Sequence, residues 1–262
     1  MTELIPDMRG PKLAAFRGNL ENIEFLKLLG PDERDRSLGD VPHGRVFLAR
    51  MDGIRYAIKI FNFFSTDEIR PYLPGAEHLL TNQVVRYQMD PFYAECRAFG
   101  RLLETNQDSS LAVRCHGYAF LPPAVEHRIT KQFGDQFQVA NWNRKPEDKG
   151  HPLRAIIKDY IHFSSPCGRK KLSTMRSNIM KLNALGVYNM DIREDNYRGG
   201  RLFDFSIAIT SPHMSLSLKL RSKKQIEEDM RLDLESFEEV EENELQRKAN
   251  IRAASLGKLR RR

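Results

Sequence analysis

The segment from residue 191 to residue 206 constrains the fold of this chain more than any other part of its sequence. Asp191 stands five residues before Asn196, and Asp204 follows eight residues later, beyond a Gly-Gly turn. Phosphoryl transfer uses such groups, because one acid orients a hydroxyl while an amide and a second acid hold metal on the nucleotide phosphates. The spacing favours this interpretation over the alternative, a β-hairpin with solvated acids at its ends.

The composition is that of an ordinary globular protein. The chain has 262 residues, enough for a full core, of which 40% are hydrophobic and 29% charged. A formal net charge of +7 permits attraction to phosphate groups on a nucleotide, a nucleic acid or a membrane surface. The three cysteines lie far apart and cannot all pair, which favours reduced thiols over a disulfide framework or a thiolate metal site. We expect no signal peptide and no membrane-spanning segment, since the N-terminus is mixed in charge and the apolar runs are short.

Hydrophobic periodicity predicts both strands and helices. Strands are predicted over residues 46–49, 56–61, 111–115, 118–121 and 154–161, and helices over residues 92–104 and 170–185. Residues 62–90 lack a clean period, so we expect an irregular connection that can include a short helix. Residues 134–150 are polar and rich in Asn, Asp, Lys and Gly, so we expect a loop or insertion there. Trp142 lies in the second of these, where it either marks a partner site or pins the loop to the body.

Lys59 lies inside an apolar strand, where a lysine is costly to bury unless it is paired. Glu95 is on the following helix and projects from the same side as Phe92 and Phe99, so it is a candidate partner. A Lys–Glu pair of this kind positions the lysine on nucleotide phosphates. The alternative is that Lys59 points to solvent from a half-exposed strand. The order of Lys59, Glu95 and the segment with two acids favours the pair.

Gly39 and Gly44 precede the first predicted strand. They match the outer two glycines of a GxGxxGxV loop that covers phosphates, but Val41 and Pro42 occupy its middle. Backbone amides of such a loop cover a phosphate, and Pro42 offers none. Two ordinary turn glycines explain the spacing equally well, so both interpretations stay open.

The C-terminal residues differ in character from the rest of the chain. Residues 223–246 are rich in Glu and Asp, with apolar residues at helical spacing, which predicts one exposed helix with a narrow apolar stripe. Residues 247–262 are basic and are predicted to fray. Binding of nucleic acid through this basic C-terminal tail, or a role of the tail in nuclear import, is a weaker alternative.

Taken in order, these features resemble the protein-kinase-like fold, an α+β fold of two lobes. Ala57-Ile58-Lys59 and Glu95 are similar to the lysine strand and the helix glutamate of its small lobe. Asn189-Met190-Asp191 stands where kinases carry His-Arg-Asp, and Asp204-Phe205-Ser206 stands where they carry Asp-Phe-Gly. The resemblance implies ATP and Mg²⁺ as cofactors, with these roles: Asp191 and Lys59 catalytic; Gly39, Gly44, Lys59 and Glu95 nucleotide-binding; Asn196 and Asp204 metal-binding.

The resemblance to kinases covers residues 36–210. It implies a small lobe over about residues 36–161 and a partial large lobe over about residues 162–210, between an N-terminal segment (1–35) and a charged helical tail (211–262). No stretch after Asp204 is similar to the part that usually binds a peptide substrate, so we expect a truncated C-terminal lobe. Lys158 stands where a residue guards the adenine pocket in kinases, and its charge needs a partner.

A closer resemblance is to a fungal family named for a kinetochore subunit of the Sim-four complex (Fta-two type). It rests on residues 92–97, on residues 191–197, and on Asp204-Phe205-Ser206 followed by Pro212-His213. The family name implies kinetochore or centromeric partners and a nuclear location, while the composition alone also allows the cytoplasm. Two functions stay open. One is a binding or scaffold module of pseudokinase type, and the other is an active ATP-dependent phosphotransferase acting on a protein or a small molecule.

Overall fold

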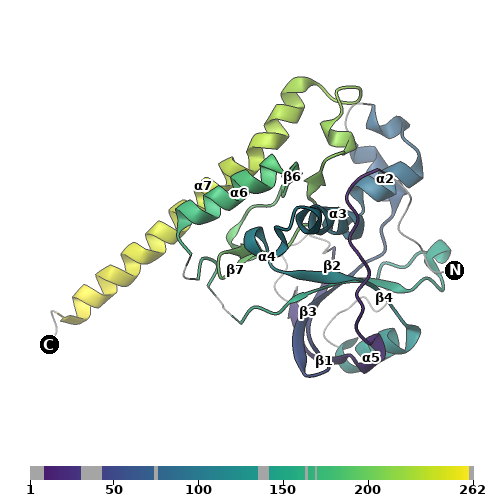
Figure 1. Cartoon of the computed structure of the whole chain (residues 1–262), viewed down its shortest axis with the longest axis horizontal. Helices are drawn as coiled ribbons and strands as arrows, with labels where there is room; N and C mark the ends of the chain where they lie inside the picture. The colour runs from purple at the N-terminus through teal and green to yellow at the C-terminus, as the bar shows by residue number, and fades with distance from the viewer. Residues whose placement is uncertain are drawn as a thin grey trace.

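The computed structural model describes residues 9–30, 43–73, 76–134, 142–162, 165–168 and 170–259, with side chains as far as residue 253. Both helices and strands are abundant, which confirms the α+β class. Figure 1 shows a sheet in one half of the molecule, helices around the other half, and the long helix α7 (Lys223–Leu259) extending away from the body.

The main sheet has five antiparallel strands in the order β1-β2-β3-β5-β4. They are β1 (Glu24–Gly30), β2 (Gly44–Met51), β3 (Ile54–Phe61), β4 (Cys115–Leu121) and β5 (Leu153–Asp159). Strands β2 and β3 form a hairpin around Asp52 and Gly53, which both have positive φ, as the Met-Asp-Gly turn predicts. Strand β5 lies between β3 and β4, with Ile156 opposite Lys59 and Lys158 opposite Ala57.

The remaining elements are helices and short strands. The helices are α1 (Thr66–Ile69), α2 (Asn82–Met89), α3 (Pro91–Glu104), α4 (Asp108–Leu111), α5 (Pro123–Phe133), α6 (Leu172–Ala184) and α7. Two small sheets pair β6 (Val187–Tyr188) with β9 (Ile209–Thr210) and β7 (Tyr197–Arg198) with β8 (Arg201–Leu202). Single turns of 3-10 helix occupy Leu20–Asn22, Arg70–Tyr72, Glu77–Leu79, Pro146–Asp148, Glu194–Asn196 and Met214–Leu216.

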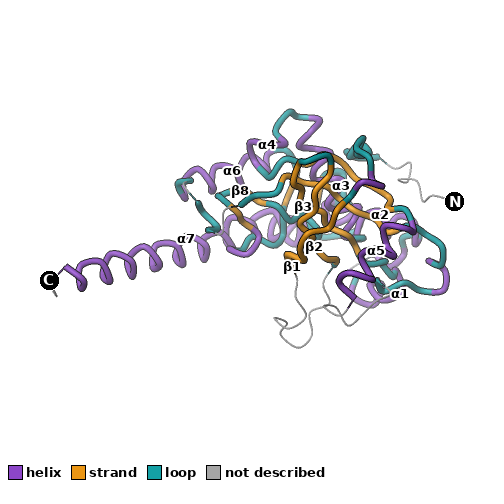
Figure 2. Tube along the Cα trace, turned by 90° about the horizontal axis from the view of Figure 1, so that it is seen from below, coloured by secondary structure: helices purple, strands orange, loops and turns teal. Residues whose placement is uncertain are grey.

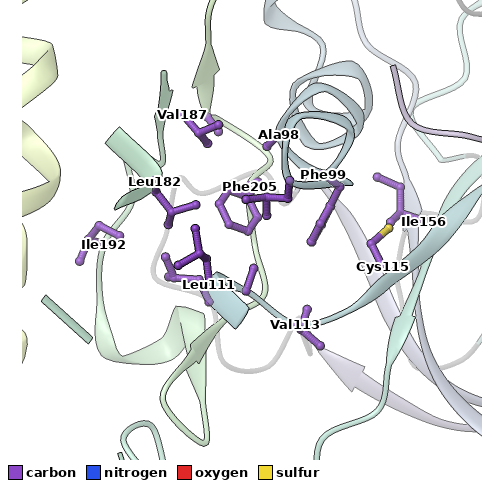
Figure 3. Packing of buried hydrophobic residues seen from close by; sticks show 14 of the residues in the cluster. Ala98, Phe99, Leu111, Val113, Cys115, Ile156, Leu182, Val187, Ile192 and Phe205 are labelled. Carbon is purple, nitrogen blue, oxygen red and sulfur yellow. The ribbon is translucent and has the colours of Figure 1, made fainter. Parts of the chain in front are cut away.

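Two hydrophobic clusters stabilise the molecule. In the first, α5 covers one side of the sheet, and Trp142 is fully buried there, so it pins its loop to the body. In the second, α3, α6 and the other side of the sheet enclose Phe205. Figure 3 shows Phe205 between Ala98 and Phe99 of α3 and Leu182 of α6, and the rings of Phe99 and Phe205 meet edge to face with centroids 5.2 Å apart.

The sequence-based assignment is wrong in one segment and incomplete in others. The predicted strand over residues 111–115 is absent, because α4 ends at Leu111 and β4 begins at Cys115. Ala112 and Val113, which lie between them, are buried, and Ala112 forms an isolated β-bridge with Leu202. Strand β1 and helix α5 were not predicted, whereas α2 is a short helix of the kind that residues 62–90 were expected to allow. An apolar run with no clear period cannot by itself distinguish a strand from a buried loop.

Helix α7 is mostly exposed with a narrow buried stripe, as the sequence predicts, but the stripe is packed against the body and includes two acids. Asp233, Phe237, Val240 and Glu244 are buried along one face, which packs against α6 and β6. The helix also continues through Leu259, past the point where fraying was expected. Helix α7 is long but highly charged. In the described part of the chain, no helix is both long and apolar enough to cross a bilayer.

Gly100 allows the N-terminal segment to pack directly on α3. A Cβ atom at this position would lie 2.8 Å from the carbonyl carbon of Lys12, closer than real Cβ contacts. We therefore expect Gly100→Ala to lower the free energy of unfolding by about 1–3 kcal/mol, because the segment must shift. Gly134 is the matched control, since its helical backbone and open surroundings accept alanine. Urea unfolding measures both variants, and equal stability of the two would contradict this account of Gly100.

Candidate functional site

Lys59, Glu95 and Asp204 meet where the sheet faces the helices. Lys59 Nζ donates to Glu95 Oε2 at 3.0 Å and to Asp204 Oδ1 at 2.7 Å. The side chain of Glu95 is 0% exposed, that of Lys59 5% and that of Asp204 26%, so only the aspartate reaches solvent appreciably. The contact between Lys59 and Glu95 that the sequence predicts is therefore present, and Asp204 joins it.

The start of α3 sets the position of Glu95. Asp90 caps the helix by accepting a hydrogen bond from the Phe92 N–H at 3.0 Å, and Pro91 occupies the first helical position. The same carboxylate accepts a hydrogen bond from Arg154 of β5, and both side chains are buried. This ion pair ties the first turn of α3 to the sheet, and Glu95 lies one turn further along, over β3 and β5.

Lys158 is a second lysine in the same cluster. Its Nζ donates to Glu95 Oε1 at 2.5 Å and to the carbonyl oxygen of Phe203 at 2.7 Å. Lys158 is 2% exposed, so its charge lies in the interior. Glu95 thus binds one lysine with each oxygen. The partner that Lys158 needs is the same glutamate that holds Lys59, which spacing along the sequence could not reveal.

The pKa values of this cluster follow from burial and charge together. Burial alone would raise the pKa of Asp204, but the ammonium groups of Lys59 and Lys158 outweigh it and hold that pKa far below its ordinary range. Burial would likewise lower the pKa of Lys59, yet Asp204 and Glu95 raise it above its ordinary value. Asp204 and Lys59 are therefore both charged at neutral pH.

The loop from residue 189 to residue 196 holds Asp191 beside this cluster. Asn196 Nδ2 donates to the carbonyl oxygen and to Oδ2 of Asp191, both at 2.8 Å. Asn189 links the two acids, since its Oδ1 accepts from the Asp191 N–H at 3.1 Å and its Nδ2 donates to the carbonyl oxygen of Asp204 at 2.7 Å. Arg193 pairs with Asp191 Oδ2 at 3.2 Å. The three residues Asp191, Asn196 and Asp204 thus belong to one hydrogen-bonded unit.

Asp233 of α7 anchors this loop from the other side. Its Oδ2 accepts from the Asn189 N–H at 2.7 Å and its Oδ1 from the Met190 N–H at 2.8 Å. Burial raises the pKa of Asp233 to about 6, although the two N–H donors oppose the shift. Sequence reasoning missed this residue. The signal was present, because Asp233 is a polar residue on the apolar face that also carries Ile226 and Phe237.

The predicted phosphate-covering loop is only partly described. Gly39 lies outside the described residues. Gly44 begins β2, and a Cβ atom there would lie 2.2 Å from the carbonyl oxygen of Ile60, so close packing of β2 on β3 requires this glycine. The neighbouring His43 contacts Ser206 Oγ through Nδ1 at 3.0 Å. The start of β2 therefore lies against the segment that follows Asp204.

The predicted Mg²⁺ ligands are Asp204 and Asn196. Mg²⁺ takes oxygen ligands and commonly uses one or two protein groups together with phosphates. Asp204 Oδ1 already accepts from Lys59 and from the Ser206 N–H at 2.9 Å, which leaves Oδ2 for a metal. Asn196 turns its nitrogen to Asp191, so its amide oxygen faces elsewhere. These two oxygens fit Mg²⁺ only with phosphate oxygens completing the set. Among the described residues, no three His, Cys, Asp or Glu side chains gather as a metal site.

Comparison with known proteins relates the chain to one family. The family model described as kinetochore Sim4 complex subunit FTA2 matches residues 2–209. No curated protein matches the chain. The matched range includes Lys59, Glu95, Lys158, Asp191, Asn196 and Asp204, while Asp233 and the rest of α7 lie beyond it.

Proposed function

The chain belongs to the kinetochore Sim4 complex subunit FTA2 family, and from this membership we propose that it is a scaffold subunit of a kinetochore assembly. The match agrees with the family resemblance that the sequence motifs indicate. The proposed partners are other kinetochore proteins, and the proposed location is the nucleus, at the centromere. The cytoplasmic alternative has no support from the family.

We further propose that the scaffold uses a protein-kinase-like frame of pseudokinase type. The observation that carries this proposal is Lys59, which bridges Glu95 of α3 and Asp204. Kinases use a lysine on a strand, fixed by a helix glutamate, to neutralise phosphate charge, and an aspartate after the catalytic loop to hold metal. The sheet supports it as well, because α3 follows β3 and β5 lies between β3 and β4.

Two features favour a scaffold over a catalyst. Lys158 places an ammonium group in the interior beside Glu95, where it ties β5 to the Asp204 segment through the carbonyl oxygen of Phe203. After β9, the described chain consists of one 3-10 turn and α7. In kinases the helices that dock a peptide come directly after this point of the chain, where this protein instead has α7, and this difference supports a frame that holds partners.

Localisation and a point variant test the proposed function together. A fluorescent fusion of the full chain, expressed in place of the native copy, is expected to form foci at centromeres. Asp191→Asn removes the carboxylate that would orient an acceptor hydroxyl, and under the scaffold proposal the foci and chromosome segregation persist. Exclusion of the fusion from the nucleus would contradict the kinetochore role.

Phosphoryl transfer remains a second proposed function, because the set of Lys59, Glu95, Asp191, Asn196 and Asp204 is complete by residue type. In that reaction Asp191 orients the acceptor hydroxyl and Lys59, held by Glu95, neutralises phosphate charge. Asn196 and Asp204 would hold Mg²⁺, which supplies further charge neutralisation. A segregation defect of Asp191→Asn with normal foci, together with labelled phosphate transfer that this variant abolishes, would favour the enzyme. Binding of nucleic acid through the basic tail stays a prediction, which a steep loss of affinity with salt would support.

A further inference from the structure

The acids of the site already have basic partners. Glu95 binds Lys59 and Lys158, and Asp204 binds Lys59. Asp191 pairs with Arg193 at 3.2 Å, in a contact open to solvent. Three carboxylates therefore lie among three cationic side chains, and their formal charges cancel.

Lys158 supplies the charge that makes this balance. Without Lys158, the two cations Lys59 and Arg193 would face three carboxylates, and the site would be net negative. A polyphosphate would then need a divalent cation to offset the repulsion. Lys158 is buried, so water screens its charge weakly. Its ammonium shares Glu95 with Lys59, which leaves Lys59 less strongly engaged by that glutamate.

Lys59 has the geometry to contact a phosphate directly. An ammonium group has three N–H donors. Within the described residues, Lys59 directs two of them to Glu95 and Asp204, so one donor remains for a ligand oxygen. Asp204, the residue that would hold a metal, has its Oδ1 committed to Lys59 and to the Ser206 N–H.

We propose that this site binds the polyphosphate of a nucleotide without a divalent cation, with Lys59 as the contact and Lys158 in place of the metal charge. The inference rests on the proposed kinase-like frame and names the ligand class of that site. It concerns binding alone and requires no transfer of phosphate.

Calorimetric titration of the full chain with ATP tests the proposal. One titration contains EDTA and the other contains excess Mg²⁺. The expected result is dissociation constants that agree within about threefold, because Lys158 already supplies positive charge beside Glu95 where a cation would otherwise be needed. Tripolyphosphate is the second probe, and its binding in EDTA would assign the interaction to the phosphates rather than to the base.

A variant of the second lysine gives an independent readout. Lys158→Met is expected to weaken binding in EDTA about tenfold or more, and Mg²⁺ should restore most of the loss. Lys181→Met, at an exposed position of α6, is the matched control and should bind as the parent does. If Lys158→Met fails to fold, the comparison of EDTA with Mg²⁺ in the parent still decides.

Two outcomes would overturn the inference. Parent binding that weakens more than about threefold in EDTA retains the nucleotide site but shows that it needs a metal. Absence of ATP binding in both buffers removes the nucleotide site altogether. Neither outcome affects the kinetochore role, which the centromere foci test separately.

Discussion

Replacing Glu95 with glutamine is expected to lower the free energy of unfolding by about 3–5 kcal/mol, because a buried ion pair that loses one partner leaves an uncompensated charge. The effect is large here since one carboxylate serves two lysines. After the change, Lys59 keeps Asp204, but Lys158 keeps only the carbonyl oxygen of Phe203. Urea unfolding followed by circular dichroism measures the loss.

Two comparisons make the Glu95 experiment specific. Glu104→Gln is the matched control, because Glu104 lies exposed at the end of the same helix, and its loss should stay within about 0.5 kcal/mol. In a Lys158→Met background, Glu95→Gln should cost less than in the parent, since one of the stranded ammonium groups is gone. A loss below about 1 kcal/mol for Glu95→Gln would mean that the two lysines do not depend on it.

Asp233→Ala is expected to lower the free energy of unfolding by about 2–5 kcal/mol, because it leaves one buried and one partly buried N–H group without an acceptor, each costing roughly 1–3 kcal/mol. Those donors belong to Asn189 and Met190, next to Asp191. Under the phosphotransferase alternative, activity would fall as well, since the loop loses its anchor. Glu239→Ala is the control, as Glu239 is exposed on the same helix.

The same variant should change how stability depends on pH. The pKa of Asp233 rises from 3.8 to about 6 in the folded protein, so the folded state binds more protons than the unfolded state between these values. Stability contributed by this group therefore falls as pH rises from about 4 to about 6. The parent should exceed Asp233→Ala in stability by a wider margin at pH 4 than at pH 7.

The stability of the parent alone would not isolate the effect of Asp233, because His213 contributes to the pH dependence as well. The parent is therefore compared with Asp233→Ala. Burial lowers the pKa of His213 from 6.5 to about 4, so this group destabilises the fold as pH falls through the same range. The two effects oppose each other in the parent, and subtraction of the variant removes the histidine contribution. A margin that does not change between pH 4 and pH 7 would contradict the raised pKa of Asp233.

Local features of the sequence predict much of the sheet and the site. The strands around Asp52-Gly53 and the helices that begin at Pro91 and Leu172 follow from periodicity and turn chemistry, which act between neighbouring residues. The contact between Lys59 and Glu95 could also be predicted from the sequence, because a buried lysine in an apolar strand needs an acidic partner and the next predicted helix carries one. The role of Gly44 could not be predicted from the sequence, because this glycine is needed for the close approach of β2 to the backbone of β3.

Many of the elements and the residue types of the site follow from the sequence alone, because hydrophobic period, turn residues and the order of Lys59, Glu95, Asp191, Asn196 and Asp204 are local or linear properties, whereas β1 and α5 do not. Two contacts appear only when the chain is folded: Lys158 shares Glu95 with Lys59, and Asp233 anchors the loop of Asp191. Both contacts join segments more than 40 residues apart. Such pairs depend on which faces of strands and helices pack together, and that choice is made by burial over the whole molecule rather than by any one segment.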